Sequence, residues 1–319
     1  MIISAKARGF QNATAASADM TFRQPREALK PDGFTLEGAE QWALEQTSSL
    51  PADRFRLTSF WYIDYIRQHV PGERKTRYIA RLAQSENYGI AFGLTVALQN
   101  TEHALALQDA DRSLVGDDSR EILKDRRYRT DVDRAALIDL VIGHSPATEN
   151  DQVMLDQTLR DKHALRARLF AHETEIIMRR KGSDAIKGRE PHVLVIGATA
   201  GVIGALVARG FKVAATDMSE DIIGGNLGGV TVRGETENAS LIEEADLVII
   251  TGMTLPTRAL PSLIESAKIS NTSTMMWAIT GKNFGSYYVE QGVDCVVSDP
   301  SPFLLLPGRA SIEVWRRRA

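Results

Sequence analysis

The chain has 319 residues, of which 43% are hydrophobic and 25% charged, so it is long enough for two domains with separate cores. Its net charge of -3 gives no surplus that would favour nucleic acid or an acidic membrane as a partner. No window approaches the ~18 apolar residues of a membrane span, and the first residues lack the apolar segment of a secretory signal. We therefore expect a cytoplasmic protein that acts on a small molecule, with a homodimer as one option for its assembly.

The first half of the chain has helical spacing of its apolar residues. The pattern runs from about residue 34 to 180 and is clear in VDRAALIDLVIGH (132–144) and TLRDKHALRARLFAHETEIIMRRK (158–181). We therefore predict an all-α N-terminal domain over residues 1–188. The polar, glycine-containing segment KGSDAIKGREP (181–191) predicts a linker.

The second half, residues 189–319, has a different pattern, in which short β-branched runs alternate with helical or turn segments. The runs are HVLVI, KVAAT, GVTVR, DLVII, TMMWAI, DCVVS and ASIEVW. Seven strand candidates with crossovers between most of them predict an open α/β sheet with mostly parallel strands.

The stretch VLVIGATAG (193–201) lies where the first of these strands should turn into a helix. A dinucleotide loop has the pattern G-x-G-x-x-G, because glycine permits the tight turn and the close approach of backbone N–H groups to a pyrophosphate. In that register the chain carries Thr199, Gly201 and Gly204, so the first glycine is missing. The short-chain dehydrogenase spacing, counted from Gly197, also fails by one residue. NAD(P) remains a possible cofactor, and the loop alone does not select it.

The next strand ends in Asp217, twenty positions after Gly197, where a carboxylate can accept hydrogen bonds from both hydroxyls of a ribose. In order and spacing, VLVIGATAG and TDMSED (216–221) resemble the first two motifs of the class I S-adenosylmethionine (SAM)-dependent methyltransferases. The resemblance extends over residues 191–315. It implies a seven-stranded, mostly parallel Rossmann sheet that binds SAM, with ASIEVW as its antiparallel last strand.

The resemblance also implies which residues bind SAM. They follow the first four strands and comprise Gly197, Ala198, Thr199, Gly201, Asp217, Met218, Glu235, Thr236, Gly252 and Thr254. Glu235 stands at the family's adenine-contacting acidic position. Two positions depart from the family: Val195 replaces the acid of the first motif, and Thr199 replaces its middle glycine. Because that acid organises the methionine end of SAM, we expect the N-terminal half to hold this end instead.

Aromatic residues are concentrated in two segments of the N-terminal half that we predict as helices, FWYIDYIRQHV (60–70) and YIARLAQSENYGIAF (78–92). An aromatic face can hold a sulfonium cation, although core packing is the competing role for each ring. Ligands of open α/β sheets bind beyond the carboxyl ends of the strands, which also places ITGMT (250–254) near the pocket. The candidate catalytic residues are Trp61, Tyr65, Tyr78, Tyr88 and Thr251.

A second resemblance concerns ITGMTLPTRAL (250–260) and ITGKNFGSYYVEQGVD (279–294). Both segments are similar to uncharacterised Rossmann-like domains that have been proposed to act in heavy-metal chelation. We predict no metal site here, because Cys295 is the only cysteine and the six histidines lack paired ligand spacing.

These patterns predict a SAM-dependent enzyme of small-molecule metabolism. Attack on a sulfonium requires positioning and exclusion of water more than a nucleophilic side chain. A helical half before a methyltransferase-like sheet is loosely similar to enzymes that cyclise SAM to azetidine-2-carboxylate and release methylthioadenosine. Methyl transfer to a small amine or amino acid is equally open. An NAD(P)-dependent oxidoreductase and a non-catalytic nucleotide- or metal-binding module are the alternatives.

Overall fold

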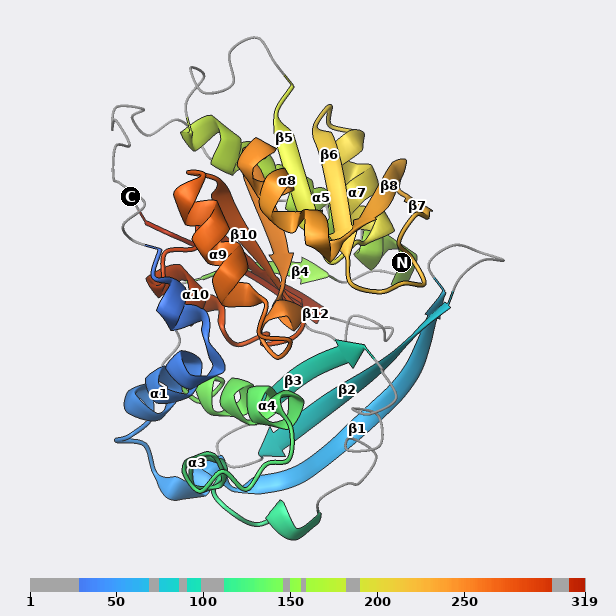
Figure 1. The fold of residues 1–319 in the computed structure, drawn as a ribbon. Helices are drawn as coiled ribbons and strands as arrows, with labels where there is room; N and C mark the ends of the chain where they lie inside the picture. The colour runs from blue at the N-terminus through green and yellow to red at the C-terminus, as the bar shows by residue number, and fades with distance from the viewer. Residues whose placement is uncertain are drawn as a thin grey trace, which may run out of the picture.

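The computed structural model describes residues 29–68, 75–85, 91–98, 112–145, 150–155, 159–181, 190–299 and 310–318. Within these ranges the chain forms a large α/β layer, and beneath it lies a smaller lobe built from a three-stranded sheet and helices (Figure 1). No helix in the described part of the chain is long and apolar enough to cross a membrane.

The large sheet has nine strands in the order β4-β12-β11-β10-β9-β5-β6-β8-β7. Six neighbouring strands are parallel, namely β8 (Val230–Gly234), β6 (Lys212–Asp217), β5 (His192–Ile196), β9 (Leu247–Thr251), β10 (Ser273–Ala278) and β11 (Cys295–Ser298). The predicted α/β class and the mostly parallel sheet are therefore confirmed. The order of these six strands is that of the doubly wound dinucleotide-binding sheet.

Three further strands complete the edges of this sheet. They are β12 (Ala310–Arg316), β4 (Asp151–Leu155) and β7 (Asn226–Leu227), each antiparallel to the neighbour it joins. All seven predicted strands are present, and the last of them, β12, is antiparallel as expected. The predicted number of seven strands is nevertheless wrong, because β4 and β7 extend the sheet to nine.

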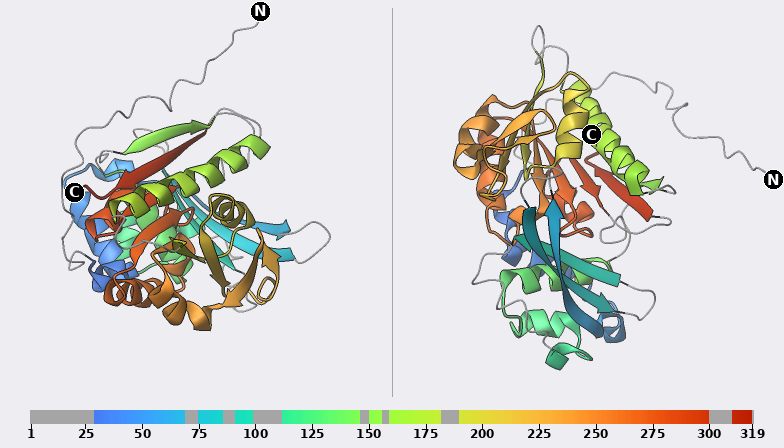
Figure 2. Two further views of the ribbon diagram at one scale, coloured as in Figure 1. Left: turned by 90° about the horizontal axis from the view of Figure 1, so that it is seen from above. Right: turned by 90° about the vertical axis from the view of Figure 1, so that its right-hand side faces the viewer.

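Helices cover both faces of the large sheet, and alternate residues of its strands point to opposite sides. Val193, Val195 and Ile249 pack with α5 (Leu159–Arg180) and α7 (Ala200–Val207). Leu194 and Ile250 belong to the core on the other face, which is covered by α8 (Asn238–Glu244), α9 (Leu260–Ile269) and α10 (Gly285–Glu290). Figure 2 (right) shows α5 and α9 on opposite sides. Burial on both faces explains why these strands are continuous apolar runs.

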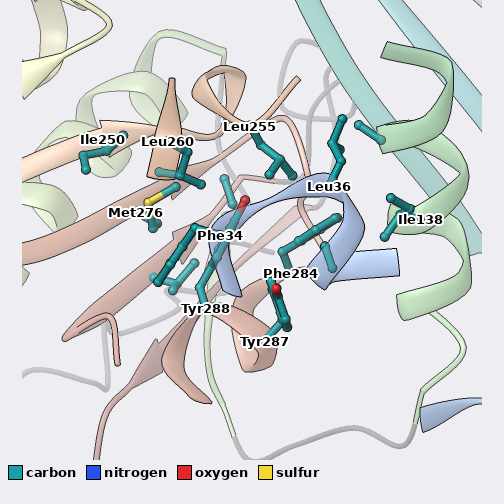
Figure 3. Packing of buried hydrophobic residues seen from close by; sticks show 14 of the residues in the cluster. Phe34, Leu36, Ile138, Ile250, Leu255, Leu260, Met276, Phe284, Tyr287 and Tyr288 are labelled. Atoms are coloured by element: carbon teal, nitrogen blue, oxygen red, sulfur yellow. The ribbon is translucent and has the colours of Figure 1, made fainter. Parts of the chain in front are cut away.

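The core on the α9 side continues into the smaller lobe. Phe34, at the end of the short helix Pro31–Phe34, stacks on Tyr288 of α10 with ring centroids 5.9 Å apart. Leu36, in α1 (Leu36–Gln46), and Ile138, in α4 (Asp131–Ile142), lie in the same cluster (Figure 3). One hydrophobic core therefore joins the two lobes.

The smaller lobe contains an antiparallel sheet where the sequence predicted helices. Its strands are β1 (Leu57–Gln68), β2 (Lys75–Ser85) and β3 (Ala91–Leu98), and α4 packs on one of its faces. The predicted all-α character of the N-terminal half is therefore wrong. Helical structure is confirmed for most of segments 132–144 and 158–181, which α4 and α5 occupy, and this half also contains the helices α1 and α3 (Ser119–Lys124).

The failure of the helix prediction for β1–β3 has a physical cause. In β2, Tyr78 and Leu82 pack with Met253 and Ile279 of the α/β layer, whereas Ile79 packs with Val132 of α4. A strand that is buried on both faces lacks the alternation of apolar and polar residues. Without this two-residue period, its sequence cannot be distinguished from that of a buried helix.

The predicted boundary at residue 188 lies in segment 182–189, outside the described residues. Two elements before it belong to the large layer, since β4 pairs with β12 and α5 packs on α7. The chain thus contributes to the α/β layer before the strand β5 begins.

His144 follows α4 and is half-buried between the smaller lobe's elements. Its Nε2 lies 2.6 Å from the Oγ of Ser85, and the ring of Phe55 packs edge-on at 4.9 Å. Burial lowers the pKa of His144, and the positive charges of Arg54 and Arg120 lower it further. The folded protein therefore favours the neutral imidazole.

This lowered pKa predicts a loss of stability in mild acid. Below pH ~6.5 the unfolded chain binds a proton at His144 before the folded chain does, so the free energy of unfolding falls as the pH drops towards the folded pKa. We expect urea unfolding at pH 7.5 and 5.0 to show a smaller pH-dependent loss for His144→Gln than for the wild type. Equal losses in the two proteins would contradict this role.

Candidate functional site

A cavity of about 570 Å³ lies at the carboxyl ends of the parallel strands. Its walls come from the loops after β5, β6, β8, β9 and β10, from α5, and from Tyr78 of β2 and Val96 of β3. The volume is in the range of small-molecule sites, and the place is the one where open α/β sheets bind ligands. The smaller lobe therefore supplies one wall of a site whose other walls belong to the large sheet and its helices.

The turn after β5 requires glycine at position 197. Gly197 has a φ of 89°, and its N–H donates to the carbonyl of Thr216 at 2.9 Å. A Cβ at this position would lie 2.5 Å from the side chain of Thr251, at the end of β9. Both the backbone conformation and the close approach of β9 exclude a larger residue.

Asp217 is held in place by the backbone of two loops. Its Oδ2 accepts from the N–H of Ala198 and its Oδ1 from the N–H of Ser219, both at 2.9 Å. Each oxygen of a carboxylate can accept two hydrogen bonds, so these contacts are compatible with a ligand hydroxyl bound at the same group. The loops orient the carboxylate at the cavity wall.

The wall beyond Asp217 is polar. Asn238, at the start of α8, accepts from the Oγ1 of Thr216 at 2.6 Å, and Glu235 follows β8 with its side chain exposed. Both line the cavity. This corner can hydrogen-bond a polar heterocycle.

The structure brings most of the predicted site residues to one cavity. The predicted residues that line it are Tyr78, Gly197, Ala198, Thr199, Gly201, Asp217, Met218, Glu235, Thr251, Gly252 and Thr254. Thr236 and Trp61 do not line it, and Trp61 is 42% exposed in β1. Tyr65 is the register partner of Tyr78, but its side chain lies outside the described residues, as does the whole of Tyr88.

Contacts between β3 and the residues after β10 hold one wall of the cavity in place. The Oγ1 of Thr280 accepts from the N–H of Val96 at 3.0 Å. Met253 and Ile279 pack against the cluster that contains Tyr78 and Val96. The Oγ1 of Thr254 donates to the carbonyl of Thr251 at 2.8 Å, which gives this threonine a structural role in the turn.

The helix α5 provides a wall of the cavity that was not predicted from the sequence. His163, Arg166 and Ala167 line the cavity, and Trp277 of β10 lies beside them. The spacing of i, i+3 and i+4 places these three residues on one face of a helix, so the sequence does contain a signal for the face. The sequence does not show which strand ends this face of the helix contacts.

The described residues do not form a metal centre of side chains. None of them belongs to a group of three or more His, Cys, Asp or Glu residues that could hold an ion. Cys295 is buried, and burial raises the pKa of its thiol, with the nearby Glu173 adding to the effect. The thiolate that binds soft metals is therefore disfavoured at this position.

Comparison with known proteins supports the second resemblance in the sequence. Residues 185–289, from before β5 to α10, match the DUF364 family model, described as "Putative heavy-metal chelation". The resemblance to methyltransferases and to azetidine-2-carboxylate synthases rests on the sequence motifs alone. No curated protein matches the chain.

Two solved structures of DUF364 proteins of unknown function are similar to this chain. The protein from Pyrococcus horikoshii is 14% identical with a TM-score of 0.45, and the match covers 88% of this chain and 99% of that one. The protein from Desulfitobacterium hafniense is 13% identical with a TM-score of 0.47, and the match covers 88% of this chain and 98% of that one.

Proposed function

We propose that the cavity binds the adenosine portion of SAM and that the protein acts at the sulfonium of this ligand. The observation that carries the proposal is the fixed carboxylate of Asp217 beside the glycine turn at Gly197. A carboxylate at the end of the second strand of such a sheet is suited to bind both hydroxyls of a ribose.

The cavity suggests an orientation for the ligand. With the ribose at Asp217, the adenine lies towards Glu235 and Asn238, and the sulfur lies along the ends of β5, β9 and β10. Of the four predicted aromatic residues, Tyr78 lines this part of the cavity. The face of its ring would attract a sulfonium by roughly 0.5 to 2 kcal/mol, depending on how well water is excluded.

Two reactions at the sulfonium fit a site that β2 and β3 border on one side. In cyclisation, the α-amine of SAM attacks its own Cγ and breaks the Cγ–S bond, which yields azetidine-2-carboxylate, methylthioadenosine and a proton. In methyl transfer, a small amine or amino acid attacks the methyl carbon and breaks its bond to sulfur, which yields the methylated amine, S-adenosylhomocysteine and a proton. Both reactions depend on positioning and exclusion of water. We place this chemistry in small-molecule metabolism of the cytoplasm.

One observation favours a second candidate function, that of an NAD(P)-dependent oxidoreductase. The six parallel strands follow the order of the dinucleotide-binding sheet, and α7 begins at the loop after β5, where a pyrophosphate would bind. Against it, Thr199 stands where the fingerprint has glycine.

A reaction with SAM alone separates these possibilities. We expect purified protein to consume SAM faster than it decays in buffer, because cyclisation needs no second substrate. Chromatography would then detect methylthioadenosine. Release of S-adenosylhomocysteine only after amines or amino acids are added would indicate methyl transfer instead. If neither product exceeds the buffer control in either mixture, the proposed activity is wrong.

A further inference from the structure

Arg166 is a buried cation in the wall of the cavity, on the helix α5. Its side chain is 9% exposed, and its Nη1 donates to the Oδ2 of the fully buried Asp299 at 2.7 Å. Its Nη2 lies 3.1 Å from the Nδ1 of His163, and its guanidinium carbon is 5.1 Å from the ring centroid of Trp277. The guanidinium is thus fixed by groups on three sides.

The hydrogen bonding of this ion pair is incomplete. Among the residues that the structure describes, neither the Nε of Arg166 nor the Oδ1 of Asp299 has a hydrogen-bond partner, and both atoms are buried. A buried donor without a partner is costly, and the cost is higher for a charged group. Arg166 also lines the cavity, so the positive charge of this incompletely paired side chain borders the space that a ligand would occupy.

Arg166 and Asp217 lie at different ends of the same cavity. Asp217 ends β6, whereas Arg166 contacts Trp277 of β10 and Asp299, which follows β11. The strands β5 and β9 lie between β6 and β10, so about 14 Å separates the two strand ends. A nucleoside at Asp217 therefore needs an extension to reach Arg166.

We propose that Arg166 binds an anionic group at the end of this extension, in a subsite formed with His163 and Trp277. Guanidinium groups recognise carboxylates and phosphates through paired N–H donors. The inference rests on the proposed function. It specifies that the ligand of the cavity has an adenosine at one end and an anionic group at the other. The carboxylate of SAM and the phosphates of a nucleotide share this chemistry.

Two pairs of probes separate the sources of the anion. SAM is compared with methylthioadenosine, which lacks the amino-acid end, and ADP is compared with adenosine. The variants are Asp299→Asn, which keeps the guanidinium, and the double variant Arg166→Gln/Asp299→Asn, which removes it without leaving a buried unpaired carboxylate. Arg168→Gln, an exposed arginine of the same helix, is the matched control.

We expect the wild type to bind one of the two probes that carry an anionic group, SAM or ADP, at least tenfold more tightly than its partner without that group in calorimetric titrations. Arg168→Gln should keep this ratio. Asp299→Asn should keep a preference for the same probe because the guanidinium remains, and the double variant should lose the preference while it still binds methylthioadenosine and adenosine. A preference for SAM assigns the anion to a carboxylate, and a preference for ADP assigns it to a phosphate.

Two results would overturn the inference in different ways. If the double variant binds adenosine probes and keeps the wild-type ratio, Arg166 is not the anion site, although the adenosine site stands. If the wild type binds none of the four probes, the proposed function fails, and the anion subsite fails with it.

Discussion

Replacing Asp217 with Ala is expected to weaken the binding of SAM and of methylthioadenosine by at least tenfold. In the proposed complex, the change removes two hydrogen bonds from ribose hydroxyls to a charged acceptor, each worth roughly 1.5 to 3 kcal/mol. It also removes the acceptor that orients the N–H groups of Ala198 and Ser219. Calorimetric titration of both ligands measures the loss.

Because Asp217 also holds its own loops, the variant must be shown to be folded, by circular dichroism and thermal unfolding. Asp221→Ala is the matched control, since Asp221 is exposed in the same segment and does not line the cavity. We expect its affinity to equal that of the wild type. Wild-type affinity in folded Asp217→Ala would show that the ribose does not bind at this carboxylate.

Replacing Gly197 with Ala is expected to have the largest effect on stability. A non-glycine residue at a φ of 89° is strained by roughly 1 to 3 kcal/mol, and the new Cβ would clash with the side chain of Thr251 at 2.5 Å. We expect the free energy of unfolding to fall by more than ~2 kcal/mol and ligand affinity to fall with it, because relief of the clash displaces the loop. Urea unfolding measures the first effect.

Gly210→Ala separates the clash from the backbone strain. Gly210 has a φ of 80°, close to that of Gly197, but a Cβ there would meet no atom within 4 Å. We expect this control to be destabilised by strain alone and therefore less than Gly197→Ala. The double variant Gly197→Ala/Thr251→Ala should recover part of the difference. Equal losses for the two single variants would mean that the contact with Thr251 has no energetic consequence.

The α/β layer could be predicted from the sequence because its strands have a local signature. Runs such as HVLVI are short, β-branched and bounded by turns, and both of their faces are buried under helices. The predicted loop residues also meet at one cavity, since strand ends of a parallel sheet lie on the same edge. The strand β4 was missed because it pairs with β12, which is distant in the chain, and β7 was missed because it has only two residues.

The smaller lobe and one wall of the site could not be predicted in the same way. The spacing of apolar residues around Trp61 and Tyr78 predicts helices. Only the contacts of β2 with α4 and with Met253 show that this segment is a strand buried on both faces. The sequence pattern indicates only that Arg166 is one of several charged residues in a long helix. Its position depends on Asp299, which is 133 residues away in the chain.

Thermal unfolding with a panel of ligands provides the most direct measurement of the proposed adenosine site. The panel is SAM, methylthioadenosine, S-adenosylhomocysteine, NAD and NADP, each at about 100 times a micromolar dissociation constant. A ligand at that ratio stabilises the folded state by ~2.7 kcal/mol, which corresponds to several degrees in melting temperature. We expect SAM and its two products to raise the melting temperature and the dinucleotides to leave it unchanged. Stabilisation by NAD or NADP alone, or by no member of the panel, would contradict the assignment of the cavity to SAM.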